Sequence, residues 1–182
     1  MDLPKIHEVS FVGRWHPYRQ WLVNRIKKAG ISINARGPGW EGGMVEHDEM
    51  IKLFNQSRIN LNLSNSASWD ARYLFSSPRA LVDRMRSRKV VEQLKARHFE
   101  INGCSGFQLS YYVAGLEKLY TIGDEIAIYG TPEDMVAKIR FYLENEDIRE
   151  SIASAGYLRT LSEHTFSKRF NELFASMGLK NA

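Results

Sequence analysis

The first 35 residues alternate between two short apolar runs and one amphipathic stretch, and this limits the chain to a small set of folds. The run Val-Ser-Phe-Val-Gly at 9–13 is typical of a buried strand that ends at glycine, and residues 31–35 alternate like a second strand. Residues 18–29 carry apolar positions at helical spacing, with cations in the last turn and Gly30 as the stop. A strand, a helix and a strand in this order predict a βαβ unit, whose strands are parallel.

The remainder of the chain continues this alternation. We predict a flexible loop at 36–43, helices at 47–57, 116–120, 132–144, 147–161 and 165–177, and strands at 59–64 and 126–129. The fold class is therefore α/β, a Rossmann-like three-layer domain with a parallel sheet. A length of 182 residues suits one domain over 1–182. Residues 66–94, with a continuous or broken helix expected from 78 to about 95, form a mainly helical insertion that is a lid, an acceptor contact or only structure.

The stretch 95–106, Lys-Ala-Arg-His-Phe-Glu-Ile-Asn-Gly-Cys-Ser-Gly, combines groups that suit a sugar nucleotide. Lys95 and Arg97 are cations that can donate to phosphate oxygens. Glu100 is a carboxylate that can accept from both hydroxyls of a ribose. Gly103 and Gly106 allow a backbone to approach a ligand closely.

This stretch also resembles a known family. The pattern Arg-x-Phe-Glu-Ile-x-Gly-Cys-x-Gly-Phe is similar to the signature of the C-terminal lobe of group 1 glycosyltransferases, and in particular of the spore maturation protein B (CgeB)-like branch. Four further segments match that lobe in order, namely Phe-Val-Gly-Arg at 11–14, Gly-Asp-Glu-Ile at 123–126, Ile-Ala-x-Ala-Gly-Tyr at 152–157 and Glu-His-Thr-Phe at 163–166. The resemblance covers most of the chain, with a gap from about 66 to 88.

The resemblance implies one lobe of a GT-B glycosyltransferase that binds a nucleoside diphosphate sugar. The enzyme would transfer the sugar to a sugar or glycan acceptor without a further cofactor. In this family a separate N-terminal lobe holds the acceptor, and 182 residues leave room for only one lobe. The resemblance therefore also implies that the chain alone is inactive, and that residues 147–182 lie near the missing lobe.

The resemblance assigns roles to four residues of the expected donor site. Glu100 would bind the ribose hydroxyls, although a carboxylate near a helix N-terminus is also favoured by the helix dipole alone. Arg97 would contact phosphate, and Lys95, two residues away and on another side of a helix, could still reach it with its long stem. Arg14 follows the glycine of the first strand and would face the diphosphate, or else is a surface arginine.

Three further residues are weaker candidates. Gly37 and Gly39 belong to the loop at the carboxyl end of the second strand, where ligands of open α/β sheets gather, so they contact the base or diphosphate or form a plain connection. Glu92 precedes Glu100 by eight residues, which reproduces the Glu-x7-Glu spacing of retaining group 1 enzymes. Because Glu92 lies in a run that looks helical, we expect the spacing to be coincidental, and the stereochemistry of transfer stays open.

Several other chemistries lack their sequence signatures. The first strand is followed by one glycine rather than Gly-x-Gly-x-x-Gly, and no P-loop occurs, so nicotinamide binding is not expected. The five histidines are scattered and no Asp-x-Asp occurs, so we expect no protein-bound metal. Cys104 is the single cysteine and is expected to pack at the turn rather than to act as a nucleophile. The lone cysteine, the lack of a signal peptide and the lack of a long apolar run predict a cytoplasmic location.

The net charge of +4 is concentrated in one cluster, which comprises Arg79, Arg84, Arg86, Arg88 and Lys89. This cluster is either a solvated helix face or a patch that attracts phosphorylated substrates or anionic lipid as a peripheral membrane contact, and no nucleic-acid motif accompanies it. Two rival functions are a nucleotide-binding or partner-docking module without catalysis, and a flavodoxin-like signalling domain. The signalling domain would need acidic residues after the first strand, where the chain has Gly13 and Arg14. His164 is expected to organise the last helices rather than to act in acid–base chemistry.

Overall fold

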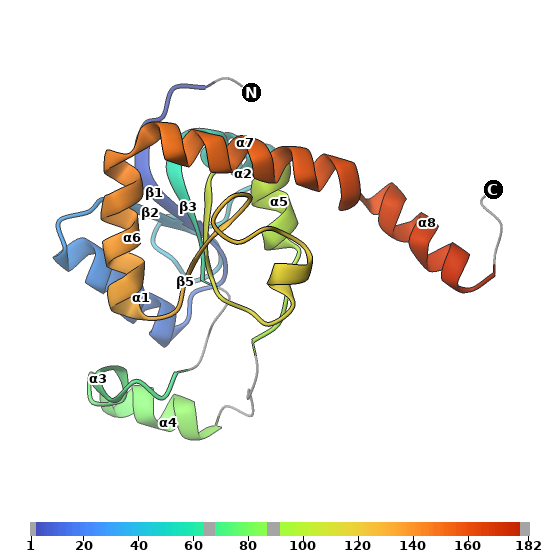
Figure 1. Cartoon of the computed structure of the whole chain (residues 1–182). Helices are drawn as coiled ribbons and strands as arrows, with labels where there is room; N and C mark the ends of the chain where they lie inside the picture. The colour runs from blue at the N-terminus through green and yellow to red at the C-terminus, as the bar shows by residue number, and fades with distance from the viewer. Residues whose placement is uncertain (1–2, 64–67, 87–91, 179–182) are drawn as a thin grey trace.

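A five-stranded parallel sheet forms the centre of the chain (Figure 1). The computed structural model describes residues 3–63, 68–86 and 92–178. The strands are β1 (His7–Val12), β2 (Ile33–Arg36), β3 (Ser57–Asn62), β4 (Gln108–Tyr111) and β5 (Ala127–Tyr129). Their order is β2-β1-β3-β4-β5, so the chain winds in opposite directions on the two sides of the β1–β3 pair. The predicted Rossmann-like α/β fold with a parallel sheet is confirmed.

The helices lie where the alternating sequence predicts them, with a few differences. They are α1 (Pro17–Lys28), α2 (His47–Asn55), α3 (Ala71–Leu74), α4 (Pro78–Arg86), α5 (Arg97–Gly103), the 3₁₀ helix η1 (Leu116–Lys118), α6 (Pro132–Glu144), α7 (Glu146–Glu163) and α8 (Phe166–Ser176). None of the helices in the described ranges is long and apolar enough to cross a bilayer.

One face of the sheet is apolar and carries α1 and α6. Alternate residues of β1 and β3 (Val9, Phe11, Ile59 and Leu61) point to this face and pack with Leu22 and Ile26 of α1 and Met135 and Ile139 of α6. Burial of apolar surface stabilises a fold by about 25 cal/mol per Å². This layer is the largest apolar cluster of the described residues, so it makes the largest hydrophobic contribution among them. The strict alternation along β1 and β3 fixes which residues face α1 and α6.

The opposite face is polar and carries α2 and α5. Ser10, Asn60 and Gln108 occupy one row across β1, β3 and β4, and all three are buried. The Ser10 hydroxyl donates to Asn60 Oδ1 over 2.7 Å, and Asn60 Nδ2 donates to the carbonyls of Phe54 at the end of α2 and of Phe107 before β4, over 3.1 and 3.3 Å. Since buried polar groups need partners, these bonds fix where α2 and β4 meet the sheet.

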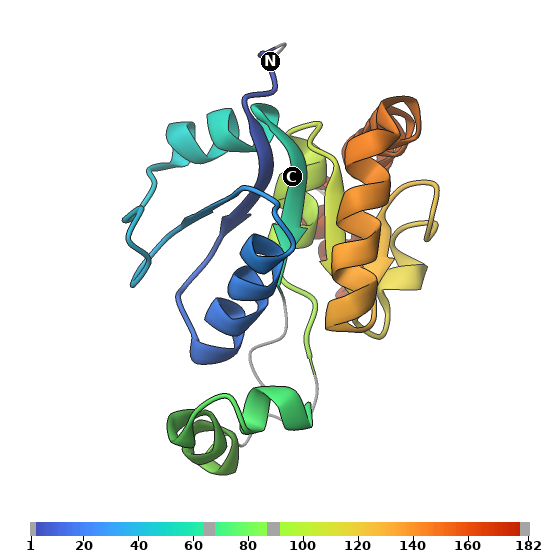
Figure 2. The same cartoon turned by 90° about the vertical axis from the view of Figure 1, so that its left-hand side faces the viewer.

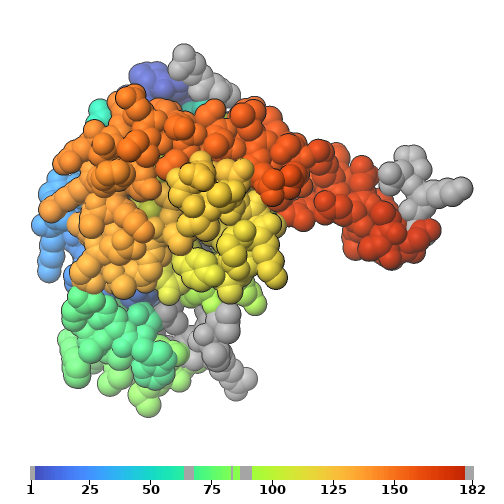
Figure 3. Space-filling view, viewed as in Figure 1, coloured from blue at the N-terminus to red at the C-terminus, as the bar shows by residue number. Residues whose placement is uncertain are grey.

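Two parts of the chain project from this body. The helices α3 and α4 lie beyond the carboxyl ends of the strands, at the bottom of Figures 1 and 2. The helix α8 extends away from the body at the end of α7 and has no buried residue (Figure 3). The segments that differ most from the sequence prediction lie next to α3 and α4.

The expected helix from 78 to 95 is wrong at its end. The helix α4 ends at Arg86, residues 92–95 are irregular, and residues 87–91, with Arg88 and Lys89 of the cationic cluster, lie outside the described residues. The predicted strand 59–64 ends at Asn62, and its last residue, Ser64, is also outside them. The small-residue turn, which the sequence predicts at 102–106, begins later, because α5 continues to Gly103.

Candidate functional site

A cavity of about 270 Å³ lies at the carboxyl ends of β1 and β3. This is the point where the strand order reverses, and ligands of open α/β sheets bind in the crevice at such a switch point. Its lining includes Gly13 after β1, Asn62 at the end of β3, and four side chains that can bind an anion or a polyol, namely Arg19, Lys95, Arg97 and Glu100. The structure thus brings together three of the predicted donor-site residues, Lys95, Arg97 and Glu100.

The start of α5 positions these three residues. His98 is fully buried, its Nδ1 lies 3.1 Å from the Lys95 backbone nitrogen, and its Nε2 lies 3.2 Å from the Ser110 hydroxyl on β4. Burial lowers the pKa of His98, so the ring is neutral at pH 7. Lys95 precedes the helix, so the helical argument for separating Lys95 from Arg97 does not apply, and both line the same cavity.

Arg97 and Glu100 form an ion pair across one turn of α5, with 2.9 Å between Nη1 and Oε2. The guanidinium of Arg97 also lies 5.4 Å from the centre of the Phe54 ring on α2. Burial lowers the pKa of Arg97, and the neighbouring Glu100 opposes that shift. The pair fixes both side chains at the edge of the cavity, and Glu100 keeps a second oxygen that can accept hydrogen bonds.

Arg19 also lines the cavity, although it is not among the site residues that the sequence predicts. It lies in the first turn of α1, donates from Nη1 to the Arg14 carbonyl over 2.8 Å, and stacks 5.6 Å from the Phe11 ring centre. Burial lowers its pKa, whereas Glu92 and Tyr129 oppose the shift, and its buried Nε has no hydrogen-bond partner among the described residues. A cation in the first turn of a helix is disfavoured by the helix dipole, and that unusual position was the available signal.

Two buried polar groups accompany Arg19 at this edge of the sheet. Asn62 is 3% exposed, and its Nδ2 has no hydrogen-bond partner within the described ranges. The Tyr129 hydroxyl at the end of β5 is likewise buried and lacks a partner there, and burial raises its pKa well above the ordinary value. A polar group that is buried without a hydrogen-bond partner costs free energy. This edge can therefore bind donors and acceptors beyond those that the described residues supply.

Arg14 and the two loop glycines support the cavity from outside. The Arg14 side chain is exposed and does not line the cavity, but its carbonyl anchors Arg19. Gly37 has φ +122°, and a Cβ there would lie 2.5 Å from the Gly13 carbonyl oxygen. Gly39 has φ +86° and would place a Cβ 2.8 Å from the Trp15 side chain. Both glycines therefore pack against the β1–α1 loop, and neither of them lines the cavity.

Gly103 and Gly106 lie at the other end of α5, away from the cavity. A Cβ on Gly106 would meet Asn60 Nδ2 at 2.7 Å, whereas one on Gly103 would make only ordinary contact with Thr160, at 3.7 Å. Neither glycine lines the cavity, so the prediction that the backbone there closely approaches a ligand stays a prediction. Glycine at Gly106 is explained instead by the packing of the turn against the polar row of the sheet.

Glu92 is placed differently from the sequence expectation. It lies in the irregular segment before α5 rather than in a helix. Its carboxylate is close enough to Arg19 and Tyr129 to raise the pKa of both groups. The reason for treating the Glu-x7-Glu spacing as coincidental, a helical Glu92, is therefore removed.

The contacts of Cys104 and His164 indicate structural roles for both residues. Cys104 is partly buried against Val12, Leu53 and Ile101, and burial raises the pKa of its thiol, which disfavours the nucleophilic thiolate. His164 Nε2 lies 2.8 Å from the Leu119 carbonyl, so His164 ties the end of α7 to the segment after η1. Within residues 3–63, 68–86 and 92–178, no three histidine, cysteine or acidic residues come together as a possible metal-binding group.

A larger groove of about 900 Å³ lies on the outer side of α1 and α6, where Ser76, Ser77 and Arg79 of the α3–α4 unit also line it. Three of its ionic groups already have partners in the chain, because Arg25 pairs with Glu133 and Arg140 donates to the Ala29 carbonyl over 3.1 Å. The smaller cavity is the better candidate, because it lies at the switch point and contains buried polar atoms without partners in the described residues.

Many solved structures share this fold, among them the following three. The structure of TarM aligns with a TM-score of 0.67 at 8% identity, over 96% of this chain and 36% of TarM. Sucrose-phosphate synthase from Thermosynechococcus elongatus gives 0.65 at 10% identity, over 96% and 46%. The pneumococcal O-GlcNAc transferase GtfA, solved in complex with UDP and GlcNAc, gives 0.60 at 12% identity, over 96% and 35%. The chain thus corresponds in fold to less than half the length of each protein.

The sequence itself is matched by one family model. No protein with a curated description matches the chain significantly. The model described as glycosyl transferase-like matches residues 18–175, which includes α1, the cavity-lining start of α5 and nearly all of α8. The chain therefore belongs to the glycosyl transferase-like family.

Proposed function

We propose that the chain is the nucleotide-sugar-binding lobe of a two-lobed glycosyltransferase of the spore maturation protein B-like branch. The observation that carries the proposal is the convergence of Arg19, Lys95, Arg97 and Glu100 on one cavity at the β1–β3 switch point. Three of the four are cations, and an acceptor-only carboxylate lies beside them. This combination fits a diphosphate joined to a ribose.

The cations would also assist the chemistry. When a sugar leaves a nucleoside diphosphate, negative charge grows on the diphosphate oxygens, and fixed positive groups in a partly buried site stabilise it. Arg19 and Arg97 are both held by neighbouring groups, Arg19 by the Arg14 carbonyl and Arg97 by Glu100, so little reorganisation is needed. We expect donor binding to be independent of added metal, because cations take that role.

Glu92 is our candidate for a contact to the donor sugar. It is eight residues before Glu100 and lies near Arg19 at the same edge of the sheet. Glu92→Gln is expected to slow sugar transfer in the complete enzyme while it leaves nucleotide affinity within a factor of two. An equal loss of nucleotide affinity would place Glu92 among the nucleotide contacts instead.

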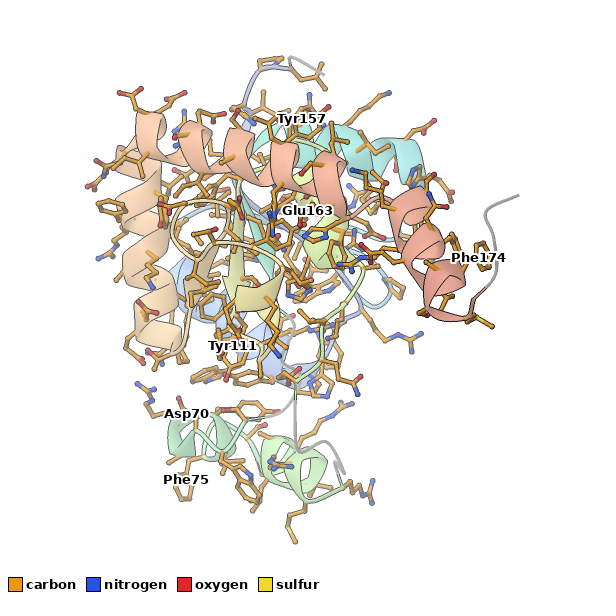
Figure 4. The ribbon with its side chains drawn as sticks, turned by 45° about the vertical axis from the view of Figure 1, so that its right-hand side comes forward. Asp70, Phe75, Tyr111, Tyr157, Glu163 and Phe174 are labelled. Carbon is orange, nitrogen blue, oxygen red and sulfur yellow. The ribbon has the colours of Figure 1, made fainter. Side chains whose placement is uncertain are left out.

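The acceptor would be held by a second lobe that packs against α8. The side chains of Phe166, Phe170 and Phe174 stack in a row along α8, and all three are exposed (Figure 4 labels Phe174). Such a row of apolar side chains on a projecting helix suits a protein partner. The chain covers less than half of each structural neighbour, which leaves room for such a lobe in the complete protein.

A thermal-shift panel of UDP, GDP, dTDP and their sugars, with and without EDTA, tests the proposal. We expect at least one nucleoside diphosphate to raise the Tm, and EDTA to leave the shift unchanged. No shift with any nucleotide would reject donor binding. A shift that requires Mg²⁺ or Mn²⁺ would indicate another class of transferase. Nucleotide binding without transfer, even beside an acceptor lobe, would favour the non-catalytic binding module.

A further inference from the structure

Two asparagines of β3, Asn60 and Asn62, point to the same face of the sheet but differ in their hydrogen bonds. They lie two residues apart on one strand, and successive side chains of a strand alternate between the two faces. Both are buried, at 0% and 3% exposure. An asparagine amide has an acceptor oxygen and a nitrogen with two donor hydrogens, so a buried asparagine needs several partners.

Both ends of the Asn60 amide are bonded within the chain. Its Oδ1 accepts from the Ser10 hydroxyl, and its Nδ2 donates to the backbone carbonyls of Phe54 and Phe107. Asn60 therefore has a structural role, because it holds the end of α2 and the start of β4 on the sheet.

The amide nitrogen of Asn62 has no comparable role in the described part of the chain. Its Nδ2 is buried and has no hydrogen-bond partner there. Asn62 pairs in register with Ser110 of β4, but the Ser110 hydroxyl donates to the Tyr111 carbonyl over 3.0 Å and lies 3.2 Å from His98 Nε2. A buried donor without a partner lowers the stability of the fold, so packing alone does not explain an asparagine at this position.

Asn62 lies where a ligand can meet it. It is the last residue of β3 and lines the donor cavity together with Gly13 and the start of α5. The Nδ2 atom itself is covered, but the χ2 torsion of asparagine is soft, so the amide can turn toward an acceptor in the cavity. A ligand can therefore supply the partner that the described residues lack.

The charges around Asn62 select the kind of acceptor. Three cations and one carboxylate line the cavity with Asn62, namely Arg19, Lys95, Arg97 and Glu100. Their net charge is +2, and it stays positive when Glu92, which lies near Arg19 but outside the lining, is counted as well. Phosphate oxygens are negatively charged and accept hydrogen bonds, whereas the hydroxyls of a sugar are neutral. The surroundings of Asn62 therefore favour a phosphate as its partner.

Arg19 reaches the same cavity from the opposite face of the sheet. Its helix α1 packs on the apolar face, and its guanidinium lies 5.6 Å from the ring centre of Phe11, which belongs to that face. Arg19 Nη1 donates to the Arg14 carbonyl, whereas Nε is buried without a hydrogen-bond partner in the described ranges. Asn62 and Arg19 thus flank the carboxyl ends of β1 and β3 from the two faces of the sheet.

We infer that Asn62 Nδ2 donates a hydrogen bond to the diphosphate of the sugar nucleotide, opposite Arg19. The contact rests on the proposed function, because a diphosphate must first enter the cavity. It differs from the contacts of the cations, because a neutral amide binds by its position and its donor hydrogens rather than by charge.

Calorimetric titration of the full chain tests the contact. The ligands are the strongest binder among UDP, GDP and dTDP, the corresponding nucleotide sugar, and inorganic pyrophosphate. Asn62→Ala removes the donor and should weaken the binding of all three ligands about tenfold or more, the factor that corresponds to one hydrogen bond to a charged group. Asn62→Asp keeps the shape but brings a carboxylate toward the phosphates, and should weaken binding further. Asn24→Asp adds the same charge at an exposed position outside the cavity and should have little effect.

Two further readouts separate a ligand contact from a role in folding. Asn62→Ala should change the Tm little, because the lost Nδ2 has no partner in the described ranges, whereas Asn60→Ala should lower the Tm by removing the bonds to Phe54 and Phe107. In the ¹⁵N-labelled chain, the side-chain amide signals of Asn62, assigned by their loss in Asn62→Asp, should shift until the ligand saturates. The Nε–H signal of Arg19 should shift with them.

The results distinguish a wrong contact from a wrong function. Binding of a nucleoside diphosphate that Asn62→Ala leaves unchanged would overturn the contact alone. So would a loss confined to the nucleotide sugar, which would place Asn62 at the sugar, or a fall in Tm as large as that of Asn60→Ala. Pyrophosphate binding that requires Asn62, without binding of any nucleotide, would support the contact and reject the proposed function. Absence of binding by every ligand would overturn both.

Discussion

Arg97 and Glu100 bind each other as well as any ligand, so substitutions at either position change two interactions. We predict that Arg97→Ala and Glu100→Gln each weaken nucleoside diphosphate binding by about 1–3 kcal/mol, the range for hydrogen bonds to charged groups. Calorimetry measures the affinity, with Arg58→Ala and Glu144→Gln as exposed controls. Because Arg97 also packs on Phe54, the Tm of each variant is compared with the parent. Unchanged affinity in both folded variants would contradict the site assignment.

His98 should give the chain a stability that depends on pH. Burial lowers its pKa in the folded chain, whereas the unfolded chain keeps a value near 6.5. Below pH 6.5 the unfolded state therefore binds more protons than the folded state, and stability falls as the pH is lowered toward the folded pKa. We predict that the Tm decreases between pH 7.5 and 5.5.

His98→Gln should flatten that decrease more than His7→Gln, because His7 is only partly buried although burial lowers its pKa as well. The pH series by differential scanning calorimetry measures both slopes. Equal slopes for the parent and His98→Gln would show that His98 is not the titrating group.

At the residue scale, the sequence predicts which side chains have suitable chemistry better than it predicts which side chains lie next to each other. Lys95, Arg97 and Glu100 stand out by charge next to a small-residue turn, and they do converge on one cavity. Arg19 and Asn62 were missed, because their importance depends on where a helix turn and a strand end meet in space. The sequence predicts that Gly103 and Gly106 allow a close approach to a ligand, whereas the contact that the structure shows at Gly106 is packing against Asn60.

At the scale of elements, the loop after β2 supports the cavity without lining it. Gly37→Ala would place a Cβ 2.5 Å from the Gly13 carbonyl oxygen at a backbone φ of +122°. We predict a loss of stability of about 2–4 kcal/mol, since left-handed strain of about 1–3 kcal/mol adds to the clash. Nucleotide affinity should fall as well, because Gly13 lines the cavity.

Gly43→Ala is the matched control for this prediction. Gly43 has φ +69° in the same loop, and its Cβ would meet nothing within 4 Å. Only the strain of the left-handed backbone should remain, so the variant should lose about 1 kcal/mol of folding stability and keep its nucleotide affinity. Urea denaturation compares the two variants, and equal losses would show that the contact with Gly13 is unimportant.

The strands and most helices follow from the sequence, because their apolar periodicity matches one sheet face and two layers of helices. The irregular segment at 92–95 does not, because its helical pattern is overridden by the turn that brings Lys95 to the cavity. The strand order also could not be predicted from the sequence. It depends on pairings such as Ser10 with Asn60, fifty positions apart, and these decide where the switch point lies.

At the scale of the whole molecule, the described residues contain one set of proposed donor-binding groups and a projecting helix with an exposed apolar row. Glycosyl transfer requires donor and acceptor to be held together away from water. We therefore predict that the isolated chain binds nucleotide weakly and transfers no sugar, and that transfer appears when a neighbouring domain of the same gene is added. A radiolabelled donor mixture measures transfer, and robust transfer by the isolated chain would contradict the single-lobe account.

Phe170→Ser with Phe174→Ser separates the role of α8 from folding. Since α8 has no buried residue, the Tm of the isolated chain should change little, whereas association with the added lobe should weaken at least tenfold. Analytical ultracentrifugation measures that association. A large loss of Tm would show that α8 stabilises this domain rather than an interface.

The central claim is that a nucleoside diphosphate occupies the cavity between β1 and β3. The most direct measurement is a titration of the ¹⁵N-labelled chain with the nucleotide that the thermal-shift panel selects, followed by amide chemical shifts. The account predicts saturable shifts at Gly13, Leu63, Ala96 and Glu100, and none at Asn24 or Arg140 in the larger groove. Shifts confined to Asn24, Arg140 and their neighbours, or no saturable shifts, would contradict it.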